Sequence, residues 1–121
     1  MVVENAINLV LFTLTQLGPI EDVYESKIPR QIVGLNTLPT NKVFKICCGA
    51  QHTLVLTTSG QIYSWGSNDE KALGRDSINT ALQVIEKIPF PMNNIAAGDC
   101  HSVAYNTDLN LLYVWGSYRV L

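Results

Sequence analysis

Two histidines have the type and the spacing to do chemistry. His52 and His101 lie 49 residues apart, and each is the last residue of a Gly-x-x-His pattern. An imidazole at such a position can ligate a metal or transfer protons near neutral pH. Neither histidine, however, has an Asp, Glu or Cys at metal-ligand spacing. We therefore expect both rings to be structural, each hydrogen-bonded to a neighbouring backbone carbonyl.

Three further side chains offer chemistry suited to a protein partner. Asp99 follows Gly98 in a predicted turn. Its carboxylate would bind a lysine or backbone N–H groups of a partner, or would accept hydrogen bonds from the backbone of its own turn. Arg119, beside Tyr118, carries a planar fork that suits a phosphate or a carboxylate. The alternative for Tyr118 and Arg119 is a solvated chain segment.

Patterns for covalent catalysis are missing from the sequence. It has no phosphate-binding loop, no Gly-x-Ser-x-Gly, no zinc pattern and no nucleophile beside a base. We therefore expect no active site, no cofactor and no metal. The net charge of −2 gives no general affinity for nucleic acid. The apolar stretch 6–14 is too short to cross a bilayer, so we expect no membrane or secretion signal.

The three cysteines form an odd set that does not suggest a disulfide framework. Cys47 and Cys48 are adjacent in an apolar strand pattern, and Cys100 lies in the second turn. Neither arrangement matches a Cys-x-x-Cys metal site. We expect all three to be reduced core residues of an intracellular protein.

A repeat with a period near 50 residues must position these side chains. Residues 42–74 recur as residues 94–117, which pairs Gly49 with Gly98 and Trp65-Gly66 with Trp115-Gly116. We expect both tryptophans to pack within equivalent units. Alternating apolar residues predict strands at 43–48, 52–57, 61–65, 95–97, 101–105 and 111–115. We also expect a strand, or a short helix, at 7–14, and a strand or extended segment at 80–88.

The repeat predicts the fold class. Strands of about five residues, glycine turns and the lack of a long helical run favour an all-β array. A repeat of about 40 to 50 residues with roughly four short strands is typical of a β-propeller blade. We expect a partial first repeat with a connecting loop at 1–41, a full repeat at 42–93 and a truncated second repeat at 94–121.

The motifs CGAQHT, GQIYSWGSNDEKALGRD and AAGDCHS, followed by YVWGSYR, resemble in combination the repeat of the regulator of chromosome condensation family. The resemblance covers about residues 9–121, and it implies part of a seven-bladed propeller. The order of the motifs is similar to the first two full repeats of the family's nucleotide exchange factor. It implies the GTPase Ran as a partner, association with the nucleosome or chromatin, and a nuclear location.

The same resemblance implies roles for individual residues. The loop that carries Asp99 would face the GTPase, and Tyr118 with Arg119 would begin a hairpin wedge directed at the GTPase's phosphate-binding region. Nucleotide exchange on the GTPase needs no covalent chemistry. A factor that binds the nucleotide-free GTPase more tightly than the nucleotide-bound form lowers the affinity of the GTPase for its nucleotide. The family's basic amino-terminal tail has no counterpart, since residues 1–9 contain neither Lys nor Arg.

The resemblance covers about two of seven blades, so we expect a fragment, a truncated product or a decayed copy. Exchange activity would then require a complete propeller. The alternative functions are a repeat scaffold or adaptor of the wider superfamily, where such repeats stand beside ubiquitin-ligase and other domains, or an inactive copy. Two blades also leave strand edges and an apolar blade face open, which predicts self-association or assembly with further blades.

Overall fold

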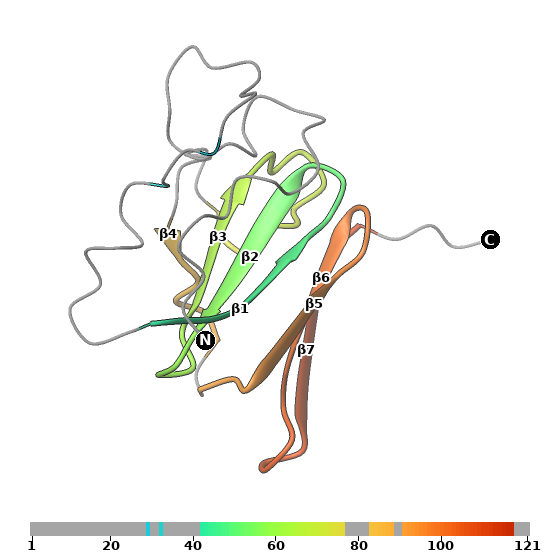
Figure 1. Cartoon of the computed structure of the whole chain (residues 1–121). Helices are drawn as coiled ribbons and strands as arrows, with labels where there is room; N and C mark the ends of the chain where they lie inside the picture. Colours follow the sequence, from blue (N-terminus) through green and yellow to red (C-terminus); the bar gives the residue numbers. More distant parts are fainter. Residues whose placement is uncertain (1–28, 30–31, 33–41, 77–82, 89–90, 118–121) are drawn as a thin grey trace.

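The structure, a computed structural model, describes residues 29, 32, 42–76, 83–88 and 91–117 of the chain. All of the regular elements in these ranges are strands, and they form two antiparallel sheets (Figure 1). The first sheet has the order β1 (Val43–Cys48), β2 (His52–Thr57), β3 (Ile62–Gly66) and β4 (Gln83–Val84). The second sheet has the order β5 (Asn94–Ala97), β6 (His101–Asn106) and β7 (Leu111–Gly116).

The two copies of the repeat have the same strand register. His52 lies opposite Gly66 across β2 and β3, and His101 lies opposite Gly116 across β6 and β7. The predicted strands in the two copies are found, with ends that differ by at most one residue. Of the stretch 80–88, only Gln83–Val84 is a strand in the described part, and the strand expected at 7–14 lies outside the described residues. The repeat boundaries at 41 and 93 stay a prediction.

The hairpins of the two copies turn differently because the second has one more residue. In the first copy, Gly60 takes a φ of +86° and its N–H donates to the carbonyl of Thr57 over 3.0 Å. In the second copy, the side chain of Asn106 accepts hydrogen bonds from the backbone of Asp108 and Leu109, both over 3.0 Å. Asn110 then takes the positive φ of 55°, which asparagine tolerates better than most residues.

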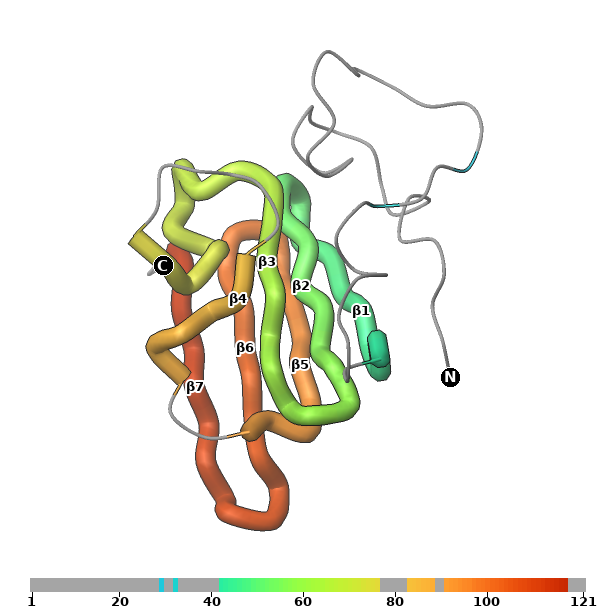
Figure 2. Tube along the Cα trace, turned by 90° about the vertical axis from the view of Figure 1, so that its left-hand side faces the viewer, coloured from blue at the N-terminus to red at the C-terminus, as the bar shows by residue number. Residues whose placement is uncertain are grey.

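The sheets stack face to face, and Figure 2 shows the second sheet behind the first with strands of both running in nearly the same direction. One apolar cluster fills the space between them. Its buried members come from both sheets and from the segments that join them: Leu54, Leu56, Ile62, Ile85, Met92, Ile95 and Ala104. Because apolar burial is the main driving force of folding, this shared cluster holds the two copies together.

The expectation that the cysteines are core residues holds in part, because Cys47 packs against the core cluster from a half-buried position. All three are free thiols, as expected, but each is only half-buried. Cys47 and Cys48 lie on β1, which pairs with β2 alone among the described strands, and its side chains are less covered than those of β2. Burial still raises the pKa of Cys47 to about 12 and raises that of Cys48, which keeps both as thiols.

The described ranges contain no helix long and apolar enough to cross a membrane. Nor do they contain a group of three or more His, Cys, Asp or Glu side chains that could hold a metal ion.

Candidate functional site

The two Gly-x-x-His turns lie side by side at one end of the stacked sheets. The N–H of Gly49 donates to the carbonyl of His52, and the N–H of Gly98 donates to that of His101, both over 2.9 Å. Each imidazole lies on its own glycine: a Cβ added to Gly49 would be 2.1 Å from the His52 ring, and one added to Gly98 would be 2.2 Å from the His101 ring. The turn therefore needs glycine at its first position because no side chain fits under the ring.

Hydrogen bonds connect these turns across the interface between the sheets. The N–H of Ala50 donates to the carbonyl of Asp99 over 2.9 Å. The buried Nε2 of His52 lies 2.9 Å from the hydroxyl oxygen of Ser102, on β6 of the second sheet. That hydroxyl donates to the carbonyl of Ala72, also over 2.9 Å. Since Ser102 has one hydroxyl hydrogen, we assign the imidazole proton to Nε2, with His52 as the donor to Ser102.

The carbonyl of Ala72, in the first copy, accepts hydrogen bonds from two side chains of the second copy. It accepts a second hydrogen bond, over 2.8 Å, from the indole Nε1–H of Trp115 on β7. Gly74, two residues further on, has a φ of +69°, and an added Cβ would lie 2.9 Å from that same indole nitrogen. The segment 72–74 of the first copy is therefore inserted against the inner face of the second sheet.

Side chains of the first copy hold the segment 72–74 in place. The hydroxyl of Ser64, on β3, donates to the carbonyl of Leu73 over 2.8 Å. The side chain of Asn68 accepts from the N–H of Leu73 over 3.2 Å and donates to the carbonyl of Arg75 over 3.0 Å. The guanidinium of Arg75 reaches back to the carbonyl of Ser64 over 3.2 Å. The loop after the Trp-Gly pair is thus a fixed connector between the sheets.

His52 has a pKa lowered from 6.5 to about 4 in this interface. Desolvation by burial is the main cause, because it penalises the charged imidazolium. The nearby imidazole of His101 lowers the pKa further, and a hydrogen bond to the backbone of His101 partly offsets both effects. His52 is therefore neutral at physiological pH.

Asp99 lies at the exposed tip of the second Gly-x-x-His turn, between β5 and β6. Its backbone carbonyl binds Ala50, while its carboxylate extends from the surface. A recess of about 90 Å³ separates this turn from the first copy, and its lining includes Asp99, Glu70 and Cys100. Two acidic residues thus line a small recess between the two copies, a setting suited to a lysine or arginine of a partner.

The structure separates the predicted site residues into two groups. Asp99 lies on the loop end of the sheets, in the turn between β5 and β6. Tyr118 and Arg119 lie outside the described residues. The remaining predicted residues form the repeated turns and strand ends described above: Gly49, His52, Trp65, Gly66, Gly98, His101, Trp115 and Gly116. Their assignment as structural repeat residues, and that of Asp99 as a contact residue, remain predictions.

Sequence reasoning missed Ser102 and the carbonyl of Ala72 as the partners of His52 and Trp115. A backbone carbonyl has no signature of its own in a sequence. For Ser102 a signal was present, because a hydroxyl residue follows the histidine in both copies, as Thr53 and as Ser102. That recurrence would have favoured a hydroxyl as the hydrogen-bond partner.

The repeat matches a known family model. The "Regulator of chromosome condensation (RCC1) repeat" matches residues 14–56 and 59–105, and a second model of the same description matches residues 45–71. Regulator of chromosome condensation from Homo sapiens is 39% identical over 110 residues, which is 86% of this chain and 24% of that protein. Probable E3 ubiquitin-protein ligase HERC3, also human, is 37% identical over 82 residues, 65% of this chain and 8% of that protein.

A solved structure agrees with the sequence comparison. Prp20p from Saccharomyces cerevisiae, whose structure was described together with its binding to Gsp1p and histones, is 31% identical and has a TM-score of 0.71. That match covers 86% of this chain and 26% of the yeast chain. This chain thus spans about a quarter of the length of such relatives. The all-β prediction is confirmed, since the two antiparallel sheets match part of an RCC1 propeller. The chain belongs to the regulator of chromosome condensation family.

Proposed function

We propose that this chain supplies part of the GTPase-binding surface of a chromatin-associated exchange factor for Ran. The 39% identity to the human regulator over 110 residues carries this proposal. The binding of Prp20p to Gsp1p and histones supports a small GTPase and a nucleosome as partners. A nuclear location belongs to the same proposal.

The geometry supplies a mechanism that needs only protein contacts. The acidic residues Asp99 and Glu70 line the recess between the copies, while the segment 72–74 and the hydrogen bonds of His52 and Ser102 hold the turns rigid. A rigid acidic edge loses little conformational entropy when it binds a basic patch of a partner. Such contacts, made preferentially with the nucleotide-free GTPase, weaken nucleotide binding by the same free energy.

The test is a chimera in which this chain replaces the matched 110 residues of the human regulator. We expect the folded chimera to stimulate release of labelled GDP from Ran. Asp99→Asn should slow that release by roughly ten- to a hundredfold, because a hydrogen bond to a charged group contributes about 1.5–3 kcal/mol. Asp108→Asn is the matched control, since Asp108 is exposed in the hairpin at the other end of β6. A folded chimera that leaves GDP release unchanged would refute the proposal.

A second candidate function is a repeat scaffold or adaptor, which the 37% identity to HERC3 favours. In that case the repeat binds other proteins, and it lies next to another domain in the same polypeptide. The chimera distinguishes the two candidates, because a scaffold repeat would restore the propeller fold without restoring stimulated GDP release.

A further inference from the structure

The loop that follows the first Trp-Gly pair has a lysine at a backbone position that usually belongs to glycine. Lys71 takes a φ of +60°, in the left-handed region, which is unfavourable for a residue with a Cβ. In the described ranges, the other residues with a positive φ are four glycines and one asparagine: Gly60, Gly66, Gly74, Gly116 and Asn110. Glycine and asparagine tolerate this conformation better than lysine does. Lys71 is therefore the exception among these positions.

The path of the loop imposes this conformation on position 71. The N–H of Lys71 donates to the carbonyl of Asn68 over 3.0 Å, which closes a turn at the exposed tip of the loop. Directly after Lys71, Ala72 and Leu73 are buried between the sheets. The chain therefore reverses at residue 71 from the surface into the interface, and glycine would make that reversal with less strain. The sequence has a long side chain where the backbone favours none.

The side chain of Lys71 has no partner that would explain it within the fold. Lys71 is exposed, and its ammonium forms no ion pair with any residue in the described ranges. The nearby Asp76 pairs with Lys87 instead. The hydrogen bond from Lys87 is the main cause of the lowered pKa of Asp76, and the charge of Lys71 is a minor one. Backbone strain persists mainly where function requires it, so an unpaired charge on a strained residue indicates a role in binding.

The acidic recess lies next to Lys71. The residues before and after it in the chain, Glu70 and Ala72, both line the recess together with Asp99. The other cation of this loop, Arg75, is held by hydrogen bonds within the first sheet. Lys71 thus places one cation beside an acidic surface. Such a surface repels a polyanion such as nucleic acid, but it complements a protein surface on which one carboxylate stands beside a basic group.

We propose that Lys71 is a specificity-determining residue of the GTPase-binding surface, where its ammonium binds a carboxylate of the GTPase beside the basic group that the acidic recess accepts. This inference rests on the proposed function, and it names the charge pattern that the partner must present. A partner with a second basic group in place of the carboxylate would be repelled by Lys71. The strain at residue 71 accompanies a contact that glycine could not make.

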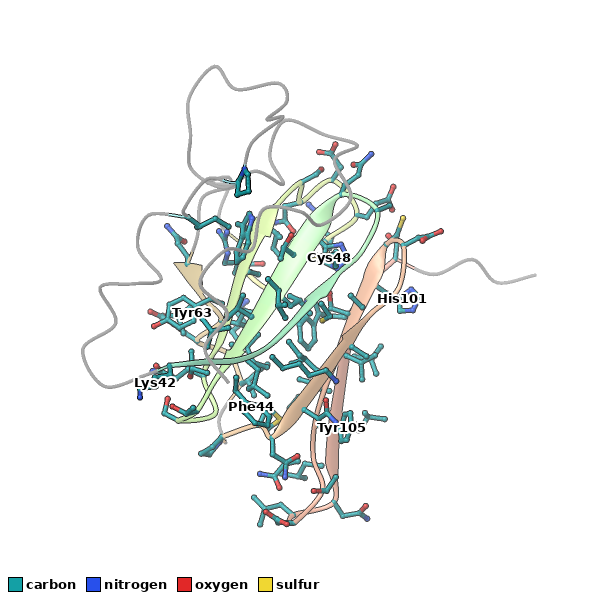
Figure 3. The ribbon with its side chains drawn as sticks, viewed as in Figure 1. Lys42, Phe44, Cys48, Tyr63, His101 and Tyr105 are labelled. Atoms are coloured by element: carbon teal, nitrogen blue, oxygen red, sulfur yellow. The ribbon has the colours of Figure 1, made fainter. Side chains whose placement is uncertain are left out.

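Substitutions at residue 71 of the chimera with the human regulator test this contact through the release of labelled GDP from Ran. Lys71→Gly should slow the release by roughly threefold, because exposed ion pairs are weak, and Lys71→Glu by roughly tenfold, because it adds repulsion. Both effects should shrink in about 0.5 M salt. Lys42→Glu is the matched control with the same change of charge. Figure 3 shows Lys42 at the end of the first sheet opposite to Cys48, so its release rate should stay as in the unsubstituted chimera.

Thermal unfolding of the full chain separates the contact from a role in the fold. Lys71→Gly should raise the unfolding midpoint by roughly 3 °C because it relieves strain, so its slower exchange cannot come from a weaker fold. A lowered midpoint would overturn the proposal. So would a chimera in which Asp99→Asn slows GDP release and both Lys71 variants leave it unchanged, although the proposed function would then stand. A folded chimera without stimulated release refutes the proposed function, and the Lys71 contact with it.

Discussion

The neutral His52 at the interface makes a quantitative prediction for stability against pH. Its pKa is about 4 in the folded protein, below the ordinary value of 6.5 that an unfolded chain has. The unfolded state therefore binds the proton more readily, so the stability that neutral His52 contributes is complete above pH 6.5 and falls as pH decreases toward the folded pKa. From these two pKa values, the free energy of unfolding should fall by about 2 kcal/mol between about pH 7.5 and about pH 5.

Urea unfolding followed by tryptophan fluorescence measures this change. In His52→Gln, the amide can still donate to Ser102 but cannot titrate, so this decrease of about 2 kcal/mol should disappear. His101→Gln is the matched control and should retain most of the decrease that belongs to His52, because burial is the main cause of the lowered pKa and the His101 imidazole is a smaller one. Carboxylates such as Asp76 contribute equally in all of these proteins and cancel in the comparison. If the wild type and His52→Gln lose stability in parallel, His52 is not buried and neutral as described.

Two substitutions test the rest of the interface. Trp115→Phe removes the indole donor to the carbonyl of Ala72 and should lower the free energy of unfolding by about 1 kcal/mol in urea titrations, because Ser102 still donates to that carbonyl; an unchanged unfolding midpoint would contradict this. Gly49→Ala places a methyl group where the His52 ring lies and should cost about 2 kcal/mol or more, measured by thermal unfolding. A Gly49→Ala protein as stable as the wild type would show that the ring does not lie on the glycine.

The sequence was sufficient for the strands because they depend on local signals. Alternating apolar residues and recurring glycines predict β2 and β3 in the first copy and β6 and β7 in the second. The Trp-Gly pair that ends β3 and β7 gives the two hairpins equivalent registers. Strand alternation and turn chemistry act over a few residues, so a single sequence contains them.

The interface between the two sheets could not be predicted from the sequence, because it depends on contacts between residues that are far apart along the chain. The repeat identifies His52 and His101, 49 residues apart, as equivalent residues of the two copies. It does not show that His52 contacts Ser102 of the other copy. The half-burial of Cys47 depends on the position of β1 at the edge of the sheet that the described strands form, which apolar composition does not reveal. The acidic recess likewise forms only when Glu70 and Asp99, from different copies, come together.

The most direct test of the account is the set of nuclear Overhauser contacts between the two copies in the protein in solution. Stacked neighbouring sheets predict contacts from the Trp115 indole to the Hα protons of Gly74, and from the His52 ring to the β-protons of Ser102. Contacts within each sheet, such as those between the paired residues Thr53 and Trp65, serve as the internal reference. If the reference contacts appear and both contacts between the copies are absent, the copies do not form adjoining blades and the account is wrong.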